Sequence, residues 1–344
     1  MEKRHSQLLL YTSPVLVPGT TTPRLMADVI IALLPPIFGA VWFFGLSAIL
    51  ILLTSTLTAV AFEKLFPVKH GKISDGSAAL TGLLVGLTLP PNMPLWMVFV
   101  GSAVAILLGK SIWGGLGQNI FNPALIGRAF LQAAFPSAIT TWNQPLTSDH
   151  FWKVPSSLLA LPLMKGNIDF VTTATPLAQM KFSHQTTAIA TLLTGNTAGS
   201  LGETSGILLI IGGIYLLWRR AFDWRIPTSI LLSAALFSAI LHYSAPLLGT
   251  PYPSPLFTVF SGGLLFGAIY MATDPVTSPL SPAATWLFGI GIGLLVVLIR
   301  NFGGLPEGVM YAILLMNAAT PLLDRAFPPT PYGRRESPNT IEKT

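Results

Sequence analysis

Residues 169–181, DFVTTATPLAQMK, form a polar stretch in a chain that is otherwise strongly apolar. Thr172, Thr173 and Thr175 are three threonines within four positions, and Asp169 precedes them. Carboxylates and hydroxyls in such stretches commonly hydrogen-bond nearby backbone groups, so the composition alone favours an ordinary turn capped by Asp169. The same hydroxyls are also alcohols that can be esterified. A structural and a chemical interpretation are therefore both open.

The spacing of these residues resembles the flavinylation signal D-x-x-[ST]-G-A-[ST], in which a flavin transferase joins the phosphate of FMN to the last hydroxyl. Asp169, Thr172, Ala174 and Thr175 match the signal, and Thr175 stands at the acceptor position. The bond made is a phosphate ester, so the reaction needs an alcohol, and small neighbours let the transferase reach it. Thr173 departs from the signal, because glycine is commoner there. The resemblance predicts FMN on Thr175.

Two further polar residues, Asn122 and Arg128, lie in the apolar segment NIFNPALIGRAFLQAAF at 119–135. Asn, Pro and Arg are costly in lipid, so this segment should face protein. In a structural interpretation, Arg128 extends its charge to the membrane interface or pairs with a nearby helix end. In a functional interpretation, it binds an anion or cofactor, since intramembrane charges usually mark sites. Asn122 and Asn317 are each explained by hydrogen bonds across helices, and Asn122 is also a candidate contact for an anion.

Other chemistries lack the residues to perform them. The absence of cysteine excludes disulfides, thiolate catalysis and cysteine-ligated iron–sulfur clusters in this chain. The five histidines are scattered without helical ligand spacing, so no metal site is predicted. No glycine fingerprint for a nicotinamide is visible, so NADH should bind elsewhere. Asp75 and Asp274 lie beside turn residues at helix ends and are predicted to cap them.

The overall composition indicates an all-α integral membrane protein. Of 344 residues, 51% are hydrophobic and only 9% are charged, whereas soluble domains carry about 25% charged residues. The net charge of +6 is better explained by basic loops beside a membrane than by nucleic acid, which is not an expected partner. The expected surroundings of the chain are membrane lipid.

About ten segments approach the roughly 20 apolar residues that a membrane helix needs. They lie near 25–45, 46–65, 77–91, 93–112, 119–136, 204–219, 226–245, 254–273, 283–300 and 307–323. With the N-terminus inside, most of the 19 Lys and Arg residues fall on the inner side. This bias predicts that both termini are cytoplasmic and that the long loop is periplasmic in a bacterium.

The sequence also repeats itself weakly. GLLVG at 82–86 matches GLLFG at 263–267, and each copy is followed by a proline-containing break. WGGL at 113–116 matches FGGL at 302–305. Because the first copy starts inside and the second outside, we predict an inverted repeat of five plus five helices with sites near the interrupted ones. The predicted parts are a cytoplasmic segment 1–24, a first repeat 25–136, a periplasmic FMN-bearing loop 137–203, a second repeat 204–323 and a cytoplasmic tail 324–344.

Topology alone fits a cofactor-free transporter or channel equally well, and this alternative is kept. Nearly the whole chain, however, resembles a family that includes the D subunit of the Rnf ion-translocating oxidoreductase and the B subunit of the sodium-translocating NADH:quinone reductase. The motifs that carry the resemblance are SDGSAALTGLLVGLTLPP, FNPALIGRAF, VTTATPLAQMK, MATDPVTSP and GGLPEGVMYAILLMNAATPLLDR. The short N-terminus favours the Rnf type.

The resemblance implies a ten-helix subunit of the bacterial inner membrane with FMN esterified to Thr175. Riboflavin held without a covalent bond is also implied, with Arg128 and Asn122 as candidate contacts. The implied partners are the other Rnf subunits, including iron–sulfur and second FMN-bearing subunits, and a flavin transferase for maturation. The subunit would pass electrons between these partners, coupled to ion transport, and is not expected to turn over substrate alone. The cofactor would carry the redox chemistry while the protein positions it.

Overall fold

The computed structural model describes residues 21–67, 75–146, 151–152, 154–162, 164, 172–248 and 251–328. Asp169 and most of the predicted terminal segments lie outside them. Throughout the described residues the secondary structure is helical, apart from one isolated antiparallel bridge between Asn143 and Thr172. The prediction of an all-α fold is confirmed for this part of the chain.

The helices fall into two groups joined by short elements. The first group consists of α1 (Thr22–Phe44), α2 (Leu46–Leu65), α3 (Ser77–Leu87), α4 (Leu95–Ile106) and α5 (Pro123–Ala134). The connecting elements are α6 (Pro136–Ile139), a 3₁₀ turn (Ser156–Leu159), α7 (Pro176–Ser183) and α8 (Ile189–Thr194). The second group consists of α9 (Gly206–Arg219), α10 (Arg225–Leu248), α11 (Pro255–Phe260), α12 (Leu264–Phe266), α13 (Pro282–Phe302) and α14 (Val309–Ala326).

Four of these helices, α1, α2, α10 and α13, are long and apolar enough to cross a membrane. The 23 residues of α1, at about 1.5 Å each, match a hydrocarbon core of about 30 Å. Shorter apolar helices occupy 77–87, 95–111 and 206–219. Large apolar side chains such as Phe38, Leu57 and Leu232 are exposed on the outer faces, as expected of helices in contact with lipid. The total of ten spans and the inverted orientation stay predictions.

The same pairs of helices pack in both groups. In the first group α4 packs on α2 and on α5, and in the second group α13 packs on α10 and on α14. Small residues allow the close approaches: a Cβ on Gly82 would lie 2.6 Å from the Cα of Thr56 in α2, and one on Gly293 would lie 2.7 Å from the carbonyl oxygen of Ile230 in α10. Helix α1 packs on α9 and joins the two groups.

One interruption lies between α3 and α4, and a second lies within the predicted span 254–273. Helix α3 ends at Leu87, and Pro90, Pro91 and Pro94 precede the start of α4, because proline lacks the N–H that a helix interior needs. In the second group, the predicted span 254–273 consists of α11, a break at Ser261–Gly263, α12 and a π-helical turn that ends at Met271. Gly262 has φ +60°, a left-handed conformation that favours glycine.

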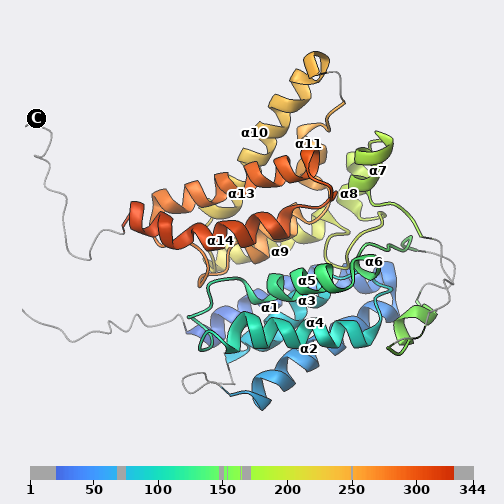
Figure 1. The fold of residues 1–344 in the computed structure, drawn as a ribbon, viewed down its shortest axis with the longest axis vertical. Helices are drawn as coiled ribbons and strands as arrows, with labels where there is room; N and C mark the ends of the chain where they lie inside the picture. The colour runs from blue at the N-terminus through green and yellow to red at the C-terminus, as the bar shows by residue number, and fades with distance from the viewer. Residues whose placement is uncertain are drawn as a thin grey trace, which may run out of the picture.

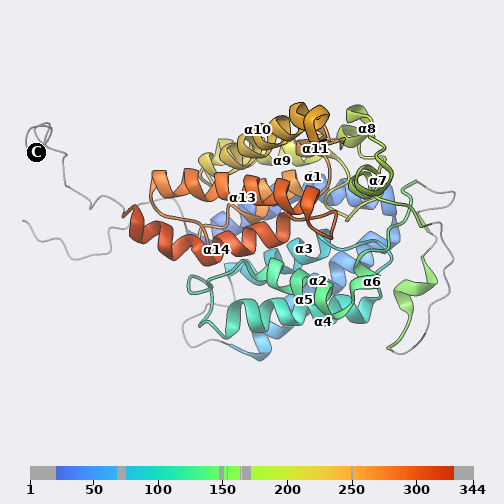
Figure 2. The same ribbon diagram turned by 45° about the horizontal axis from the view of Figure 1, so that its top comes forward.

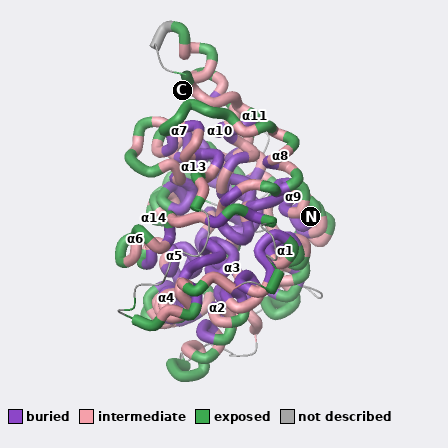
Figure 3. The backbone as a smooth tube through the Cα atoms, turned by 90° about the vertical axis from the view of Figure 1, so that its right-hand side faces the viewer, coloured by how far each residue is buried: buried purple, intermediate pink, exposed green. Residues whose placement is uncertain are grey.

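The connecting helices gather at one end of the molecule. Figures 1 and 2 show α6, α7 and α8 together at the end where α13 turns into α14. Figure 3 views the molecule from that side and shows the most buried residues in the middle, where α1, α3, α5, α9 and α13 meet. The threonine-rich stretch therefore lies over the junction between the two groups.

Candidate functional site

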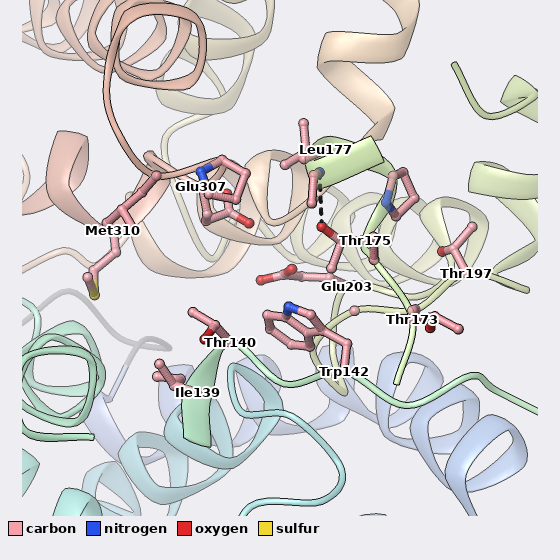
Figure 4. Close-up of a pocket in the computed structure, with 18 of the residues that line it drawn as sticks. Ile139, Thr140, Trp142, Thr173, Thr175, Leu177, Thr197, Glu203, Glu307 and Met310 are labelled. Atoms are coloured by element: carbon pink, nitrogen blue, oxygen red, sulfur yellow. Dashed lines mark hydrogen bonds between the residues drawn. The ribbon is translucent and has the colours of Figure 1, made fainter. Parts of the chain in front are cut away.

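A cavity of about 420 Å³ opens beneath α7. Its walls come from α5, residues 139–142, the start of α7, the loop before α9, Gly262 in the break, and residues 304–311. Both helix groups therefore contribute to it. Figure 4 shows Thr175, Trp142, Glu203 and Met310 arranged around this space.

Thr175 is the N-cap residue of α7. Its hydroxyl oxygen accepts a hydrogen bond from the amide of Ala178 at 3.2 Å (Figure 4). Pro176 occupies the first helical position, where its missing N–H costs nothing and its fixed φ suits the helix. Thr175 is half-buried and lines the cavity. The sequence Thr-Pro therefore starts a helix with its hydroxyl facing the cavity.

The residues before Thr175 are tied to the segment that follows α6. The amide of Thr173 donates to the carbonyl of Trp142 at 3.0 Å, and Thr172 forms the isolated bridge with Asn143. Thr172 and Ala174 are exposed. Thr173 is not among the described residues with positive φ, so its backbone does not need the glycine of the flavinylation signal. Asp169 lies outside the described residues, and its predicted role stays a prediction.

Arg128 lies on α5 and reaches the cavity, where it meets Glu203. Its Nη1 donates to Oε1 of Glu203 at 3.3 Å, and the two side chains are 9% and 6% exposed. Arg128 thus forms a buried ion pair on the cavity wall. The predicted anion or cofactor contact of Arg128 stays a prediction.

Glu203 was not identified as a candidate site residue from the sequence. The signal that could have found it is its position, as an acidic residue directly before the predicted span 204–219. The broken end of α3 holds its loop: the amides of Leu201 and Gly202 donate to the carbonyls of Leu89 and Leu87 at 3.1 and 2.7 Å. These carbonyls are available because the prolines after Leu89 prevent the helix from continuing. The proline break thus helps to place a charged side chain in the cavity.

A second ion pair joins Arg300 and Glu307 at 3.3 Å. Arg300 also donates to the carbonyls of Thr258 and Ser261, at 2.8 and 3.1 Å, which lie on either side of the end of α11. Glu307 lines the cavity and accepts from the amide of Gly263 at 3.4 Å. The sequence did not single out Arg300, because its partners are distant or lie in irregular segments.

Asn122 does not line the same cavity as Arg128. It is the N-cap residue of α5, where its oxygen accepts from the amide of Ala124 and its nitrogen donates to the carbonyl of Met271, both at 3.0 Å. It borders a separate cavity of about 60 Å³, together with Asn119, Lys110 and Asp274. The predicted hydrogen bond across helices is confirmed for Asn122. For Asn317, which is buried, no hydrogen-bond partner is found among the described residues.

The two aspartates predicted as caps hold turns beside helix ends, and neither is an N-cap residue, because Gly76 precedes α3 and Ser281 precedes α13. Asp75 accepts from the amide of Ser77 at 2.9 Å just before α3. Asp274 accepts from the amide of Val276 at 3.2 Å in the break after Met271. Among the described residues, no group of three or more His, Cys, Asp or Glu side chains is arranged to hold a metal ion.

Comparison with known proteins extends this description. The model of the NQR2, RnfD, RnfE family matches residues 9–333. The chain belongs to this family. Among its relatives, the D subunit of the proton-translocating ferredoxin:NAD(+) oxidoreductase complex of Clostridium ljungdahlii is 38% identical, over 94% of this chain and 96% of its own length.

Two further family members are similar over comparable lengths. The D subunit of the ion-translocating oxidoreductase complex of Stutzerimonas stutzeri is 39% identical, over 92% of this chain and 93% of its own. The D subunit of the Na(+)-translocating ferredoxin:NAD(+) oxidoreductase complex of Acetobacterium woodii is 38% identical, over 95% of each. Together with the apolar helices, these relatives establish a multi-pass membrane subunit of the Rnf type.

Proposed function

We propose that this chain carries FMN as a phosphoester on Thr175 and passes electrons between partner subunits of an Rnf-type complex, coupled to ion transport. The observation that carries the proposal is the position of the Thr175 hydroxyl, at the start of a helix and on the wall of a cavity of about 420 Å³. Ligand pockets commonly measure about 300–1,000 Å³. The cavity is therefore large enough for a flavin.

The start of α7 suits a phosphate. The first backbone N–H groups of a helix have no partner within the helix, and together with the helix dipole they favour an anion. Pro176 has no N–H, so the nearest such groups belong to Leu177 and Ala178. A phosphoester on Thr175 would replace the hydroxyl that now caps Ala178 with a group that carries negative charge.

The cavity wall suits a flavin ring. Trp142, Phe182, Phe260 and Tyr311 supply aromatic surface, and the hydroxyl of Thr173 is buried without a partner among the described residues. A buried polar atom of this kind can be satisfied by a ligand that brings its own hydrogen-bonding groups. When bound, FMN would supply electron transfer, and the chain would position it and exclude water.

Most Lys and Arg residues fall on the side of the membrane predicted to be cytoplasmic. This bias supports a periplasmic location for α7 and a bacterial inner-membrane location for the chain. A covalent bond keeps the flavin from escaping into the periplasm. The implied partners are iron–sulfur and second FMN-bearing subunits, together with the flavin transferase. The two relatives named for protons and for Na(+) are equally similar to this chain, at 38% identity. The proposal is therefore limited to ion translocation without naming the ion.

Riboflavin, the second cofactor implied by the resemblance, is not included in the proposal. The cavity beside Asn122 offers polar groups from Asn119 and Lys110, but its volume of about 60 Å³ is far below the roughly 300 Å³ of small ligand pockets. The residues present do not fit a flavin in this conformation. Arg128 belongs to the cavity beside Thr175 instead.

A denaturing gel and an intact-mass measurement test the proposal. The protein is produced in cells that contain the flavin transferase, because attachment is enzymatic. We expect the wild-type band to fluoresce and to carry the mass of one FMN phosphoester. Thr175→Ser should keep the flavin, since it retains an alcohol, and Thr175→Ala should lose it. Ser183→Ala serves as a control, because it removes an exposed hydroxyl of the same helix outside the flavinylation signal.

Two results would contradict the proposal. A wild-type chain without flavin would favour the cofactor-free transporter or channel. A fluorescent Thr175→Ala chain would place the ester on another residue.

A further inference from the structure

Lys181 connects α7 to the end of α13. Its ammonium group donates to three backbone carbonyls, those of Arg300 at 2.9 Å, Gly303 at 2.5 Å and Leu305 at 2.9 Å. An ammonium has three N–H donors, so all of them are used. Removal of water from around this group lowers the pKa of Lys181 below the ordinary value of 10.5.

The carbonyls that Lys181 contacts lie at the end of α13, where backbone carbonyls need hydrogen-bond donors. The last carbonyls of a helix have no N–H within the helix, and a positive charge is favourable there. Helix α13 ends at Phe302, and the chain then turns through residues 303–308 to α14. This turn contains Glu307, which lines the cavity beside Thr175. Lys181 therefore fixes a wall of that cavity as well as α7.

An apolar contact also holds α7, and Leu177 in it lies one helical turn before Lys181. Leu177 and Met180 are buried in a small cluster with Leu192 of α8 and Phe257 of α11. Apolar contacts have little directional preference, so they allow α7 to slide or rotate on this surface. Hydrogen bonds, in contrast, need a defined donor–acceptor geometry. The three hydrogen bonds of Lys181, which lies six positions after Thr175, therefore fix the orientation of α7.

We propose that Lys181 is a positioning residue, which sets the orientation of α7 so that a group attached to Thr175 enters the cavity. This inference rests on the proposed function, because it assigns the group to Thr175. Lys181 acts through the helix and through the turn at 303–308. It does not line the cavity beside Thr175.

Hydrogen exchange in protein produced without the flavin transferase tests the anchor without any flavin and keeps the Thr175 cap of α7. Lys181→Met keeps the length of the side chain but removes the donors. We expect amide protection in 177–183 and in 303–308 to fall about tenfold or more, because hydrogen bonds from a charged donor are strong. Lys181→Arg should restore most of the protection. Gln179→Met, on the same helix and outside the cavity beside Thr175, should leave protection unchanged.

The flavin-bearing chain tests the consequence. With FMN content measured separately by mass, Lys181→Met should still carry FMN, but iodide should quench its fluorescence several-fold more strongly. The midpoint potential of the flavin should also move, and Lys181→Arg should reverse both changes.

Each outcome is decisive. Unchanged hydrogen exchange in Lys181→Met overturns the anchor. Reduced protection with unchanged quenching and potential shows a structural contact only and overturns the positioning role. A wild-type chain without FMN refutes the proposed function, while the hydrogen-exchange comparison still reports on Lys181.

Discussion

The guanidinium of Arg128 donates to the carboxylate of Glu203 at 3.3 Å, across 75 positions of sequence. Both side chains are buried, and both line the cavity beside Thr175. Water has little access to either group, so each charge is compensated by the other and not by solvent. Removing one partner of such a pair leaves an uncompensated charge, whereas removing both does not.

The pair should control the redox potential of a flavin on Thr175. Glu203→Gln leaves the positive charge of Arg128 beside the cavity and should raise the midpoint potential, because reduction adds negative charge. Arg128→Leu leaves Glu203 unpaired and should lower the potential and impair electron transfer. Each single variant should lose about 3–5 kcal/mol of stability, and the double variant should recover most of it. Redox titration and thermal unfolding measure the two effects.

Shifts of the same sign in the two single variants would rule out this electrostatic role. If Arg128→Leu prevents assembly of the complex and Glu203→Gln leaves the potential unchanged, the pair has a purely structural role.

Gly262 should be intolerant of a side chain. Its φ of +60° is strained for other residues, and a Cβ would lie 2.4 Å from Cδ1 of Leu177 in α7. Gly262→Ala should therefore displace α7 and cost at least about 1 kcal/mol for the left-handed backbone alone. Thermal unfolding and FMN content should both decrease.

Gly304→Ala is the matched control, because a Cβ there meets nothing within 4 Å. Equal stability of the two alanine variants would show that the close packing of α7 on Gly262 is not maintained in solution.

Asn122 should contribute through two separate hydrogen bonds. Asn122→Ser keeps a capping oxygen for Ala124 but loses the donor to Met271. Asn122→Ala loses both. The cap is worth about 1 kcal/mol, and an unsatisfied buried carbonyl costs about 1–3 kcal/mol. Thermal unfolding should therefore rank wild type above Asn122→Ser and Asn122→Ser above Asn122→Ala. Equal stability of serine and wild type would exclude the contact with Met271.

Thr173→Gly restores the residue that the flavinylation signal usually contains. Thr173 does not adopt positive φ, and glycine would keep the backbone N–H that donates to the carbonyl of Trp142. Glycine should therefore not increase the fraction of chains that carry FMN. The added backbone freedom should cost about 0.5–1 kcal/mol. Intact mass and thermal unfolding provide the two measurements. A marked rise in FMN content would show that the transferase, rather than the fold, requires glycine at this position.

The sequence was sufficient for features that depend on local physics. Span 46–65 was predicted with the bounds of α2, because a run of apolar residues in lipid must satisfy its backbone within a helix. Thr175 was selected by its spacing to Asp169, and Thr-Pro is itself a local helix start. The interruption at Pro90–Pro91 followed from the missing N–H of proline.

Tertiary structure decided which of these residues meet. Asn122 and Arg128 lie six positions apart on α5, which is about 240° around a helix and about 9 Å along it; they therefore border different cavities. Glu203 and Lys181 find their partners across the fold, on α5 and at the end of α13. The sequence by itself thus determined the membrane class, the helix breaks and the candidate acceptor hydroxyl, since each depends on neighbouring residues. Only the packing of the two helix groups determined the cavity and its charges, because these depend on residues that are distant along the chain.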